Sequence, residues 1–253
     1  MGCEYRILCW HQDRIDWVRL PQLSLVVSYV QPLPEGFLVV GARCRWHPEG
    51  AEPNAVVADF SGRILRELTL GDGIEDVMVS RNGTIWVSYF DEGVFGNFGW
   101  GGPGPTPIGA SGLVAFTPTG DLRFSYDPAA AGTDQICDAY AMNVAANDDV
   151  WVYFYDEFPV IRIANGNYQK WSFGIGGAHG LAVHGTRVLL VGDYNRPSLG
   201  RVLHLGNDGV AHLVEEVLIV DDSGNPIEGA RMSGLGSDLY FFKDTKVWII
   251  RTW

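Results

Sequence analysis

Apolar and polar residues alternate in short runs along this chain, and the runs repeat. GTIWVSYFDEG (83–93) and DVWVYFYDEF (149–158) both alternate apolar and aromatic residues and contain Asp-Glu near their ends. Alternation with a period of two predicts half-buried strands rather than helices. Further copies of the same run are TRVLLVGDYN (186–195) and SDLYFFKDTK (237–246), and a weaker one is EGFLVVGARCR (35–45).

Each run follows a shorter strand-like segment and precedes, in four cases, a further hairpin. IEDVMVS (74–80) leads into the first run through an Arg-Asn-Gly turn, and Asn-Gly is a strong hairpin signal. After that run, GLVAFTPTGDLRFSYD (112–127) turns at a Thr-Gly pair. Two hairpins per repeat make a four-stranded unit, which is the blade of a β-propeller. We therefore predict an all-β chain built from such blades.

The number of repeats predicts the number of blades. Four units are complete, whereas the fifth, residues 230–253, contains three strand-like segments. We expect the N-terminal segment YRILCW (5–10) to supply the missing strand, so that the two ends of the chain close the ring and hide open sheet edges. The prediction is a single β-propeller domain over residues 1–253 with five blades. Six blades are the alternative if residues 1–22 contain another hairpin.

One repeat carries a resemblance to known families. The stretch VSRNGTIWVSYFDEGVFG (79–96) resembles the D-x-x-G-x-l-W-v repeats of NHL-type, SMP-30-like and two-component-regulator propellers. The similarity covers the repeat pattern of most of the chain and implies the propeller fold. It specifies no activity, because such propellers include lactonases, lyases, sensors and scaffolds.

In a propeller, the loops that leave the second strand of each blade open on the same face as those that enter the first strand. Residues at these positions should therefore ring one mouth of the central channel. Asp76 and His179 lie at equivalent positions of two repeats, each ten residues before the matching position of the second strand, and so nearest the axis. The residues that we expect to bind a ligand at this mouth are Arg43, Asp91, Glu92, Tyr140, Tyr194 and Arg231.

Acidic side chains at the mouth allow two kinds of chemistry. Converging carboxylates raise one another's pKa or attract a cation. Asp156, Asp193 and Asn195 would supply the oxygen ligands that Ca²⁺ or Mg²⁺ prefers, and a nearby histidine also suits Mn²⁺. His179 is either a structural residue that fills the channel or a general base beside Asp76 or Glu75. For each strand-end Asp-Glu, a simple solvated turn is the alternative.

Residues 91–111, DEGVFGNFGWGGPGPTPIGAS, replace a connection that is short in the other repeats. Gly-Pro pairs keep the segment irregular, and long loops on rigid scaffolds commonly form lids. We expect Phe95, Phe98 and Trp100 to lie over the mouth and contact the ligand. The alternative is that these aromatic side chains pack against the adjacent blade.

Composition excludes several partners. The chain carries 30 acidic and 18 basic residues, a formal charge of −12, and no run of lysine and arginine, so we expect no nucleic acid. The four cysteines lack metal-binding spacing. We see no signal peptide and no run of about 18 apolar residues that would span a bilayer. These features predict a cytoplasmic protein that does not bind membranes.

Together, these observations favour a ligand-binding or catalytic propeller. We expect a small polar molecule to enter the acidic mouth, with or without a divalent cation. If the protein is an enzyme, hydrolase or lyase/isomerase chemistry by acid–base catalysis fits best. His179 would move the proton, and Arg43 or Arg231 would hold an anion. The alternative is a non-catalytic interaction module whose aromatic loop anchors a protein partner.

Overall fold

Strands form almost all of the regular structure of the protein. The computed structural model describes residues 4–11 and 14–251. Within them the only helices are α1 (Asp91–Phe95) and α2 (Pro128–Ala131). Neither of these short helices has the length or apolar character needed to cross a membrane. The all-β prediction is therefore confirmed.

The chain divides into two compact units, which we describe separately. The first contains the residues up to Val79 together with Gly83–Tyr126, and the second contains Ser80–Asn82 and the residues from Asp127 onward. The short Ser80–Asn82 turn belongs to the second unit, where the backbone N–H of Arg81 donates to Asp148 Oδ1 at 2.9 Å.

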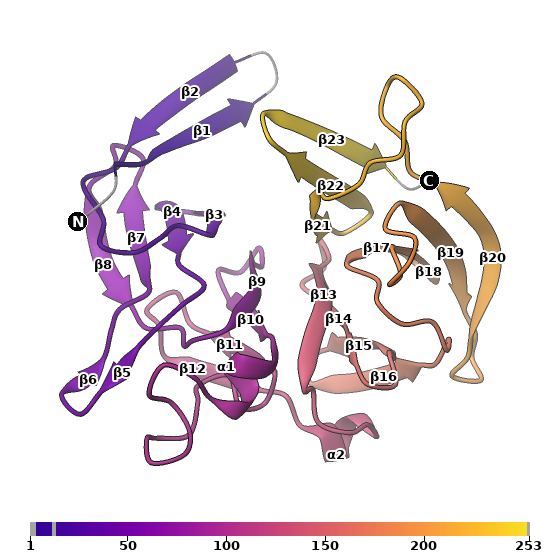
Figure 1. Ribbon diagram of the computed structural model, residues 1–253, viewed down its shortest axis with the longest axis horizontal. Coiled ribbons are helices and arrows are strands. Elements are labelled where there is room, and N and C mark those ends of the chain that lie inside the picture. The colour runs from indigo at the N-terminus through magenta and orange to yellow at the C-terminus, as the bar shows by residue number, and fades with distance from the viewer. Residues whose placement is uncertain (1–3, 12–13, 252–253) are drawn as a thin grey trace. The chain divides into compact units, whose positions relative to one another are not determined.

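The first unit contains two four-stranded antiparallel sheets and two hairpins (Figure 1). In both sheets the strands follow chain order, apart from the small hairpin inserted after β4. The first sheet comprises β3 (Tyr29–Leu33), β4 (Gly36–Val40), β7 (Ala55–Asp59) and β8 (Ile64–Leu68). The second comprises β9 (Ile74–Val79), β10 (Ile85–Tyr89), β11 (Leu113–Phe116) and β12 (Leu122–Ser125). The hairpins are β1 (Arg6–His11) with β2 (Arg14–Arg19), and β5 (Trp46–His47) with β6 (Gly50–Ala51).

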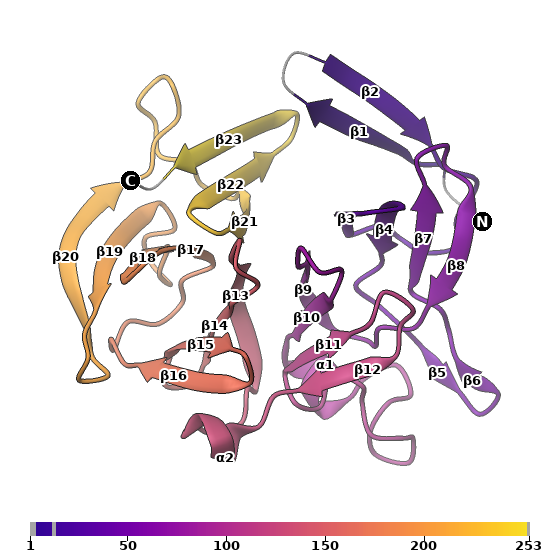
Figure 2. The same cartoon turned by 180° about the vertical axis from the view of Figure 1, so that it is seen from behind.

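The second unit repeats the same arrangement (Figure 2). Its first sheet comprises β13 (Asp138–Val144), β14 (Val150–Tyr155), β15 (Val160–Ala164) and β16 (Asn167–Trp171). The next comprises β17 (Gly180–His184), β18 (Arg187–Val191), β19 (Leu199–Leu205) and β20 (Ala211–Leu218). The last three strands are β21 (Arg231–Leu235), β22 (Asp238–Lys243) and β23 (Lys246–Arg251). A single parallel bridge between Asn143 and Gly234 joins β13 to β21.

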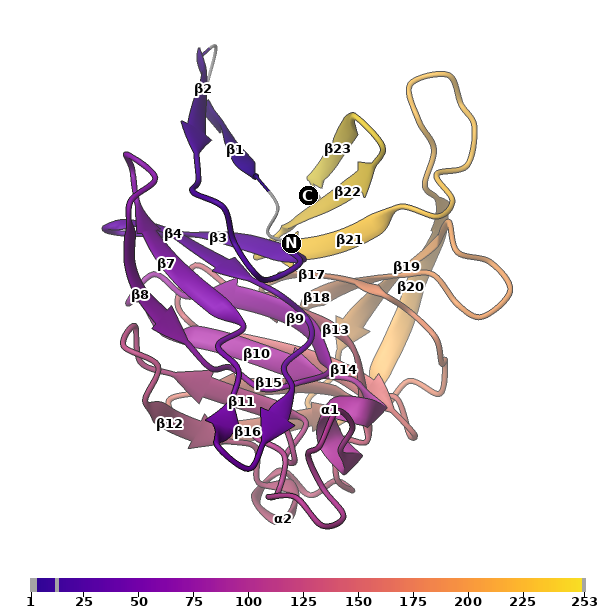
Figure 3. The same cartoon turned by 60° about the vertical axis from the view of Figure 1, so that its left-hand side comes forward.

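Face-to-face packing of neighbouring sheets explains why the middle strands are apolar on both sides. In the first unit, Val40 and Val57 of one sheet share a core with Val77 and Val87 of the next, and all four are fully buried. Figure 3 shows the strands of these two sheets next to each other. A strand that is covered on both faces consists almost entirely of apolar residues. In an outer strand such as β8, partly buried residues alternate with exposed ones. The same packing joins the sheets of the second unit.

The repeated runs of the sequence correspond to the second strand of each sheet, namely β4, β10, β14, β18 and β22. The segment that we expected to complete the C-terminal sheet, β1, has its hydrogen-bonded partner in β2. A hairpin at this place is what the six-blade alternative requires. The number of blades stays a prediction.

Buried asparagine amides connect separate segments of each unit. In the second unit, Asn143 of β13 is fully buried, and its Nδ2 donates to Leu181 O at 2.8 Å and to Gly236 O at 3.0 Å. Its Oδ1 accepts from the backbone N–H of Gly236 at 2.9 Å. One side chain thus holds the first strands of all three sheets together.

We predict that Asn143→Ala lowers the free energy of unfolding by about 3 kcal/mol, because it removes three hydrogen bonds from a buried amide to backbone groups. Gly236 O then keeps only the backbone N–H of Val183, at 2.8 Å. Urea unfolding followed by tryptophan fluorescence measures this change. Asn167→Ala, at an exposed position of β16, is the control and should change stability by less than about 0.5 kcal/mol. Equal effects of the two substitutions would contradict the role given to Asn143.

Candidate functional site

A cluster of aromatic rings lies at one end of the sheets of the second unit. Tyr140 comes from the start of β13, His179 from the residue before β17, and Tyr194 from the loop after β18. The ring of His179 stacks on Tyr140 with centroids 4.9 Å apart and an interplanar angle of 20°. The hydroxyl groups of Tyr140 and Tyr194 are 3.1 Å apart. The structure thus brings together three of the predicted site residues.

Phe158 lies at the centre of this cluster. Its ring centroid is 5.3 Å from those of Tyr140 and Tyr153, 5.7 Å from that of Tyr155 and 6.2 Å from that of Tyr194. Edge-to-face geometry predominates, as expected from the quadrupoles of aromatic rings. Phe158 was not among the predicted site residues, although it follows directly after the Asp-Glu pair of its repeat.

The glycine-rich segment before β17 makes room for these rings. A Cβ atom on Gly176 would lie 2.6 Å from the ring of Phe158, and one on Gly177 would lie 2.9 Å from the backbone nitrogen of Tyr194. Gly177 also has a φ of +82°, which other residues adopt rarely. These glycines therefore allow the close approach of aromatic side chains.

His179 is both packed and accessible. One face of its ring lies against Tyr140, while the side chain as a whole remains exposed to solvent. Desolvation by the surrounding chain lowers the pKa of His179 below 6.5, and a hydrogen bond with the backbone of Tyr140 partly opposes this shift. The imidazole is therefore mainly neutral at pH 7, which is the form that a general base requires.

The loop that carries Tyr194 is fixed by a buried arginine. Arg201 of β19 is 1% exposed, and its Nη2 lies 2.7 Å from Asp193 Oδ2, while its Nε lies 3.0 Å from Glu216 Oε1. Arg196 also pairs with Asp193, at 3.0 Å. Burial by itself would raise the pKa of Asp193, but hydrogen bonds from Arg201 and from backbone N–H groups hold it well below its usual range.

The ion pairs of Asp193 involve one of the predicted metal ligands. Asp193 already accepts two guanidinium groups, and its Oδ1 accepts from the backbone N–H of Asn195 at 2.9 Å. A cation at Asp193 would have to displace the arginines. Asp156 is exposed, after β14. Within residues 4–11 and 14–251, no three His, Cys, Asp or Glu side chains converge so as to hold a metal ion. The metal site stays a prediction, and no step below uses it.

Arg43 is the centre of a polar network in the first unit. It forms two parallel hydrogen bonds with Asp72, both 2.9 Å long, and an ion pair with Glu92 at 2.7 Å. Asp72 is buried and also accepts from the backbone N–H of Cys44. A cavity of about 450 Å³ lies beside Arg43, lined also by Ser24, Ser28 and Glu52 among others. Arg43 and Glu92 were predicted site residues, whereas Asp72 was not.

Segment 91–111 is packed within the first unit. Asp91 and Glu92 begin α1, and Phe95 at its end is exposed. Phe98 lies beneath two guanidinium groups, with its centroid 4.3 Å from Arg43 Cζ and 4.6 Å from Arg45 Cζ. The buried indole of Trp100 donates to Cys44 O at 2.8 Å. The geometry of Trp100 and Phe98 fits packing; contact with a ligand stays a prediction.

The remaining predicted residues fall in separate places. Glu75 and Asp76 lie on β9 of the first unit, half-buried, where Asp76 Oδ1 accepts from the backbone N–H of Val77 and Glu75 O accepts from the hydroxyl of Tyr29. Arg231 is exposed at the start of β21 in the second unit. His179 and the two acids belong to different units, so the predicted pairing between them stays a prediction.

We predict that the NMR titration of His179 has its midpoint below 6.5, because its ring is desolvated. Tyr140→Ala should raise the midpoint towards 6.5 by exposing the second face of the imidazole. Tyr140→Phe keeps the stacked ring and should preserve the low value. His179→Gln identifies the resonance. A midpoint that does not respond to Tyr140→Ala would contradict the proposed cause.

Two solved structures of other proteins are similar to this chain. Virginiamycin B lyase from Staphylococcus aureus aligns with a TM-score of 0.50 and 14% identity, over 97% of this chain and 76% of the lyase. A gluconolactonase from Xanthomonas campestris aligns with a TM-score of 0.47 and 13% identity, over 96% and 77% of the two chains. The lyase alignment and the four-stranded sheets confirm the β-propeller fold class.

Sequence comparison gives a family. No curated protein matches the sequence. A family model described as the YxzG family matches residues 113–250, which cover the last strands of the first unit and nearly all strands of the second, including the whole ring cluster. Because that match extends over more than half of the residues, this chain belongs to the YxzG family.

Proposed function

We propose that this propeller binds a small polar molecule at the ring cluster of the second unit and acts on it by acid–base catalysis, with His179 as the general base. The observation that carries the proposal is the stacked pair of His179 and Tyr140 beside the hydroxyl of Tyr194. A neutral proton acceptor would then lie next to a pair of bonded hydroxyl groups at one end of the sheets.

His179 would take the proton. Its lowered pKa leaves a nitrogen lone pair available at pH 7, and its exposure gives a substrate access to the ring. The stacked Tyr140 limits rotation of the imidazole, so that the acceptor nitrogen keeps its direction. A base held in this way supports removal of a proton either from a carbon or from an attacking water.

The tyrosine pair would stabilise the charge that develops on the substrate. One hydroxyl proton forms the bond between Tyr140 and Tyr194, and either oxygen can be the donor. When Tyr140 donates to Tyr194, the proton of Tyr194 is directed to an external acceptor such as a substrate oxygen. Phe158 and the anchored Asp193–Arg201 pair hold both rings in place. Preorganised donors of this kind lower the barrier more than flexible ones.

Hydrolase and lyase chemistry can both use a general base together with a hydrogen-bond donor of this kind. The names of the similar structures, gluconolactonase and virginiamycin B lyase, supply two probe substrates for these two classes. We therefore propose to assay gluconolactone and virginiamycin B with the purified protein, in the presence and in the absence of EDTA. Loss of turnover in the presence of EDTA would support the prediction that the reaction needs a divalent cation.

We predict that His179→Gln lowers kcat/KM by at least about 100-fold, because general-base catalysis contributes this much or more. Tyr194→Phe should lower kcat by about 100-fold through loss of one hydrogen-bond donor in the transition state.

The wild-type rate should fall as the pH decreases through a value below 6.5, because protonation of His179 removes the base. Steady-state kinetics over the range from pH 5 to pH 8 measures all three effects.

His184→Gln is the matched control, since His184 is exposed at the far end of the same strand, β17. Its rate should equal that of the wild type. Thermal unfolding of each variant separates loss of activity from loss of fold. If His179→Gln retains wild-type turnover, the base is elsewhere. If the wild type converts neither probe and neither probe raises its melting temperature, the interaction module becomes the better explanation.

A further inference from the structure

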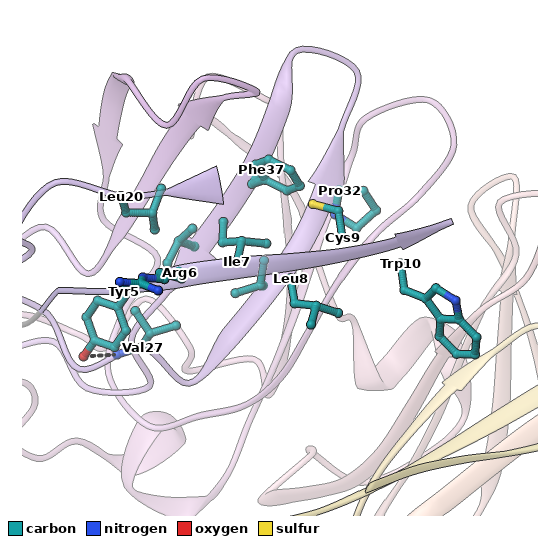
Figure 4. Close-up of a pocket in the computed structure, with 12 residues that line it drawn as sticks. Tyr5, Arg6, Ile7, Leu8, Cys9, Trp10, Leu20, Val27, Pro32 and Phe37 are labelled. Carbon is teal, nitrogen blue, oxygen red and sulfur yellow. Dashed lines mark hydrogen bonds between the residues drawn. The ribbon is translucent and has the colours of Figure 1, made fainter. Parts of the chain in front are cut away.

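A second candidate site lies in the first unit, far along the sequence from the ring cluster. A cavity of about 550 Å³ runs beside strand β1 (Figure 4). Its volume is within the usual range for ligand pockets, roughly 300–1,000 Å³. The walls are mainly apolar and come from β1 and from the segment before and within the first sheet, and they include Leu8, Trp10, Val27, Val30 and Pro32.

Side chains from both faces of β1 border the cavity. Ile7 of β1 is buried in a core with Phe37 and Val39 of the first sheet. Arg6, Leu8 and Trp10 must therefore lie on the other face of the strand, and they border the cavity along the edge of β1 that faces away from its partner β2. Leu8 is 48% exposed and Trp10 is 66% exposed, so this face is covered only in part.

The polar side chains that line the cavity differ in what they can offer a ligand. The hydroxyl of Tyr5 is already used, because it donates to Leu25 O and accepts from the backbone N–H of Val27, both at 3.2 Å. Burial, together with the charge of Asp16, raises the pKa of the Cys9 thiol and keeps it neutral. Arg6 is then the charged group of the wall. Among the described residues, it forms no ion pair.

The arginine stands at one end of the apolar wall. Figure 4 shows Arg6 beside Tyr5 at the beginning of β1 and Trp10 near the end of the strand. From Arg6 to Trp10 there are four residue steps, which an extended strand covers in about 13 Å at ~3.3 Å per residue. A ligand that fits this distribution is apolar over most of its length and anionic at one end.

We propose that this cavity binds a free medium-chain carboxylate. Its hydrocarbon chain lies along Leu8 and Trp10 and against Val27 and Val30, and its carboxylate pairs with the guanidinium group of Arg6. Guanidinium binds carboxylate through two parallel hydrogen bonds, which fixes the direction of the chain in the cavity. A cationic amphiphile would meet the charge of Arg6, and a neutral one would leave that charge without a partner.

The experiment compares decanoate with decanol, which has the same chain without the charge. Isothermal titration should show that decanoate binds the wild type more tightly than decanol does. Arg6→Gln should weaken decanoate binding by about tenfold, since hydrogen bonds to charged groups contribute about this factor, and should leave decanol binding within about twofold. Circular dichroism shows whether each variant is folded.

Two further variants locate the ligand. Leu8→Asn should weaken the binding of both compounds, because it places a polar group in the wall. Trp17 pairs with Leu8 across the hairpin and shares its face, but it does not line the cavity. Trp17→Ala should therefore leave the binding of both compounds unchanged.

Several outcomes would overturn the proposal. They are absence of decanoate binding, equal decanoate binding by the wild type and Arg6→Gln, and an effect of Trp17→Ala as large as that of Leu8→Asn. Binding to anionic phospholipid vesicles without binding to decanoate would show a membrane surface as the partner instead. None of these outcomes depends on the ring cluster, so the proposal can fail while the proposed function holds.

Discussion

Burial of both faces of the middle strands is the constraint on which the rest of this structure depends. Each sheet is covered by a neighbour, so β4 and most of β14 consist of apolar residues on both sides. Water is excluded from these strands, and any polar atom within them must find a partner in the protein. Asn143 meets this requirement with three hydrogen bonds to backbone groups. Polar chemistry is consequently displaced to the ends of the strands, where the loops begin.

This constraint also explains what the sequence could predict. The alternating runs and their Gly turns are local features, and they located the second strand of every sheet. Selecting residues that follow these strands found Tyr194, while selecting those that precede the first strands found Tyr140 and His179. These three side chains meet because neighbouring sheets bring the ends of their strands and the loops there close together.

The residues that the sequence could not reveal are those whose role depends on packing between sheets. Arg201 is one of several arginines in strand-like runs, and nothing in its local pattern shows that it is buried between Asp193 and Glu216. Asp72 follows a Gly in an ordinary turn, yet it is the buried partner of Arg43. Asp193 was predicted as a metal ligand from its place after a strand, and nothing in its local pattern shows that a guanidinium group of the neighbouring strand pairs with it. Predicting such pairs needs the register between strands, which a single sequence does not specify.

The glycines at 176 and 177 have a consequence for the evolution of this site. A segment of this composition resembles a flexible linker, in which substitutions usually accumulate freely. Here the rings of Phe158 and Tyr194 occupy the space that a side chain would need. Divergence in this family should therefore be slower at these two glycines than at the exposed aromatic residues around them, because an alanine would push apart the rings of the cluster.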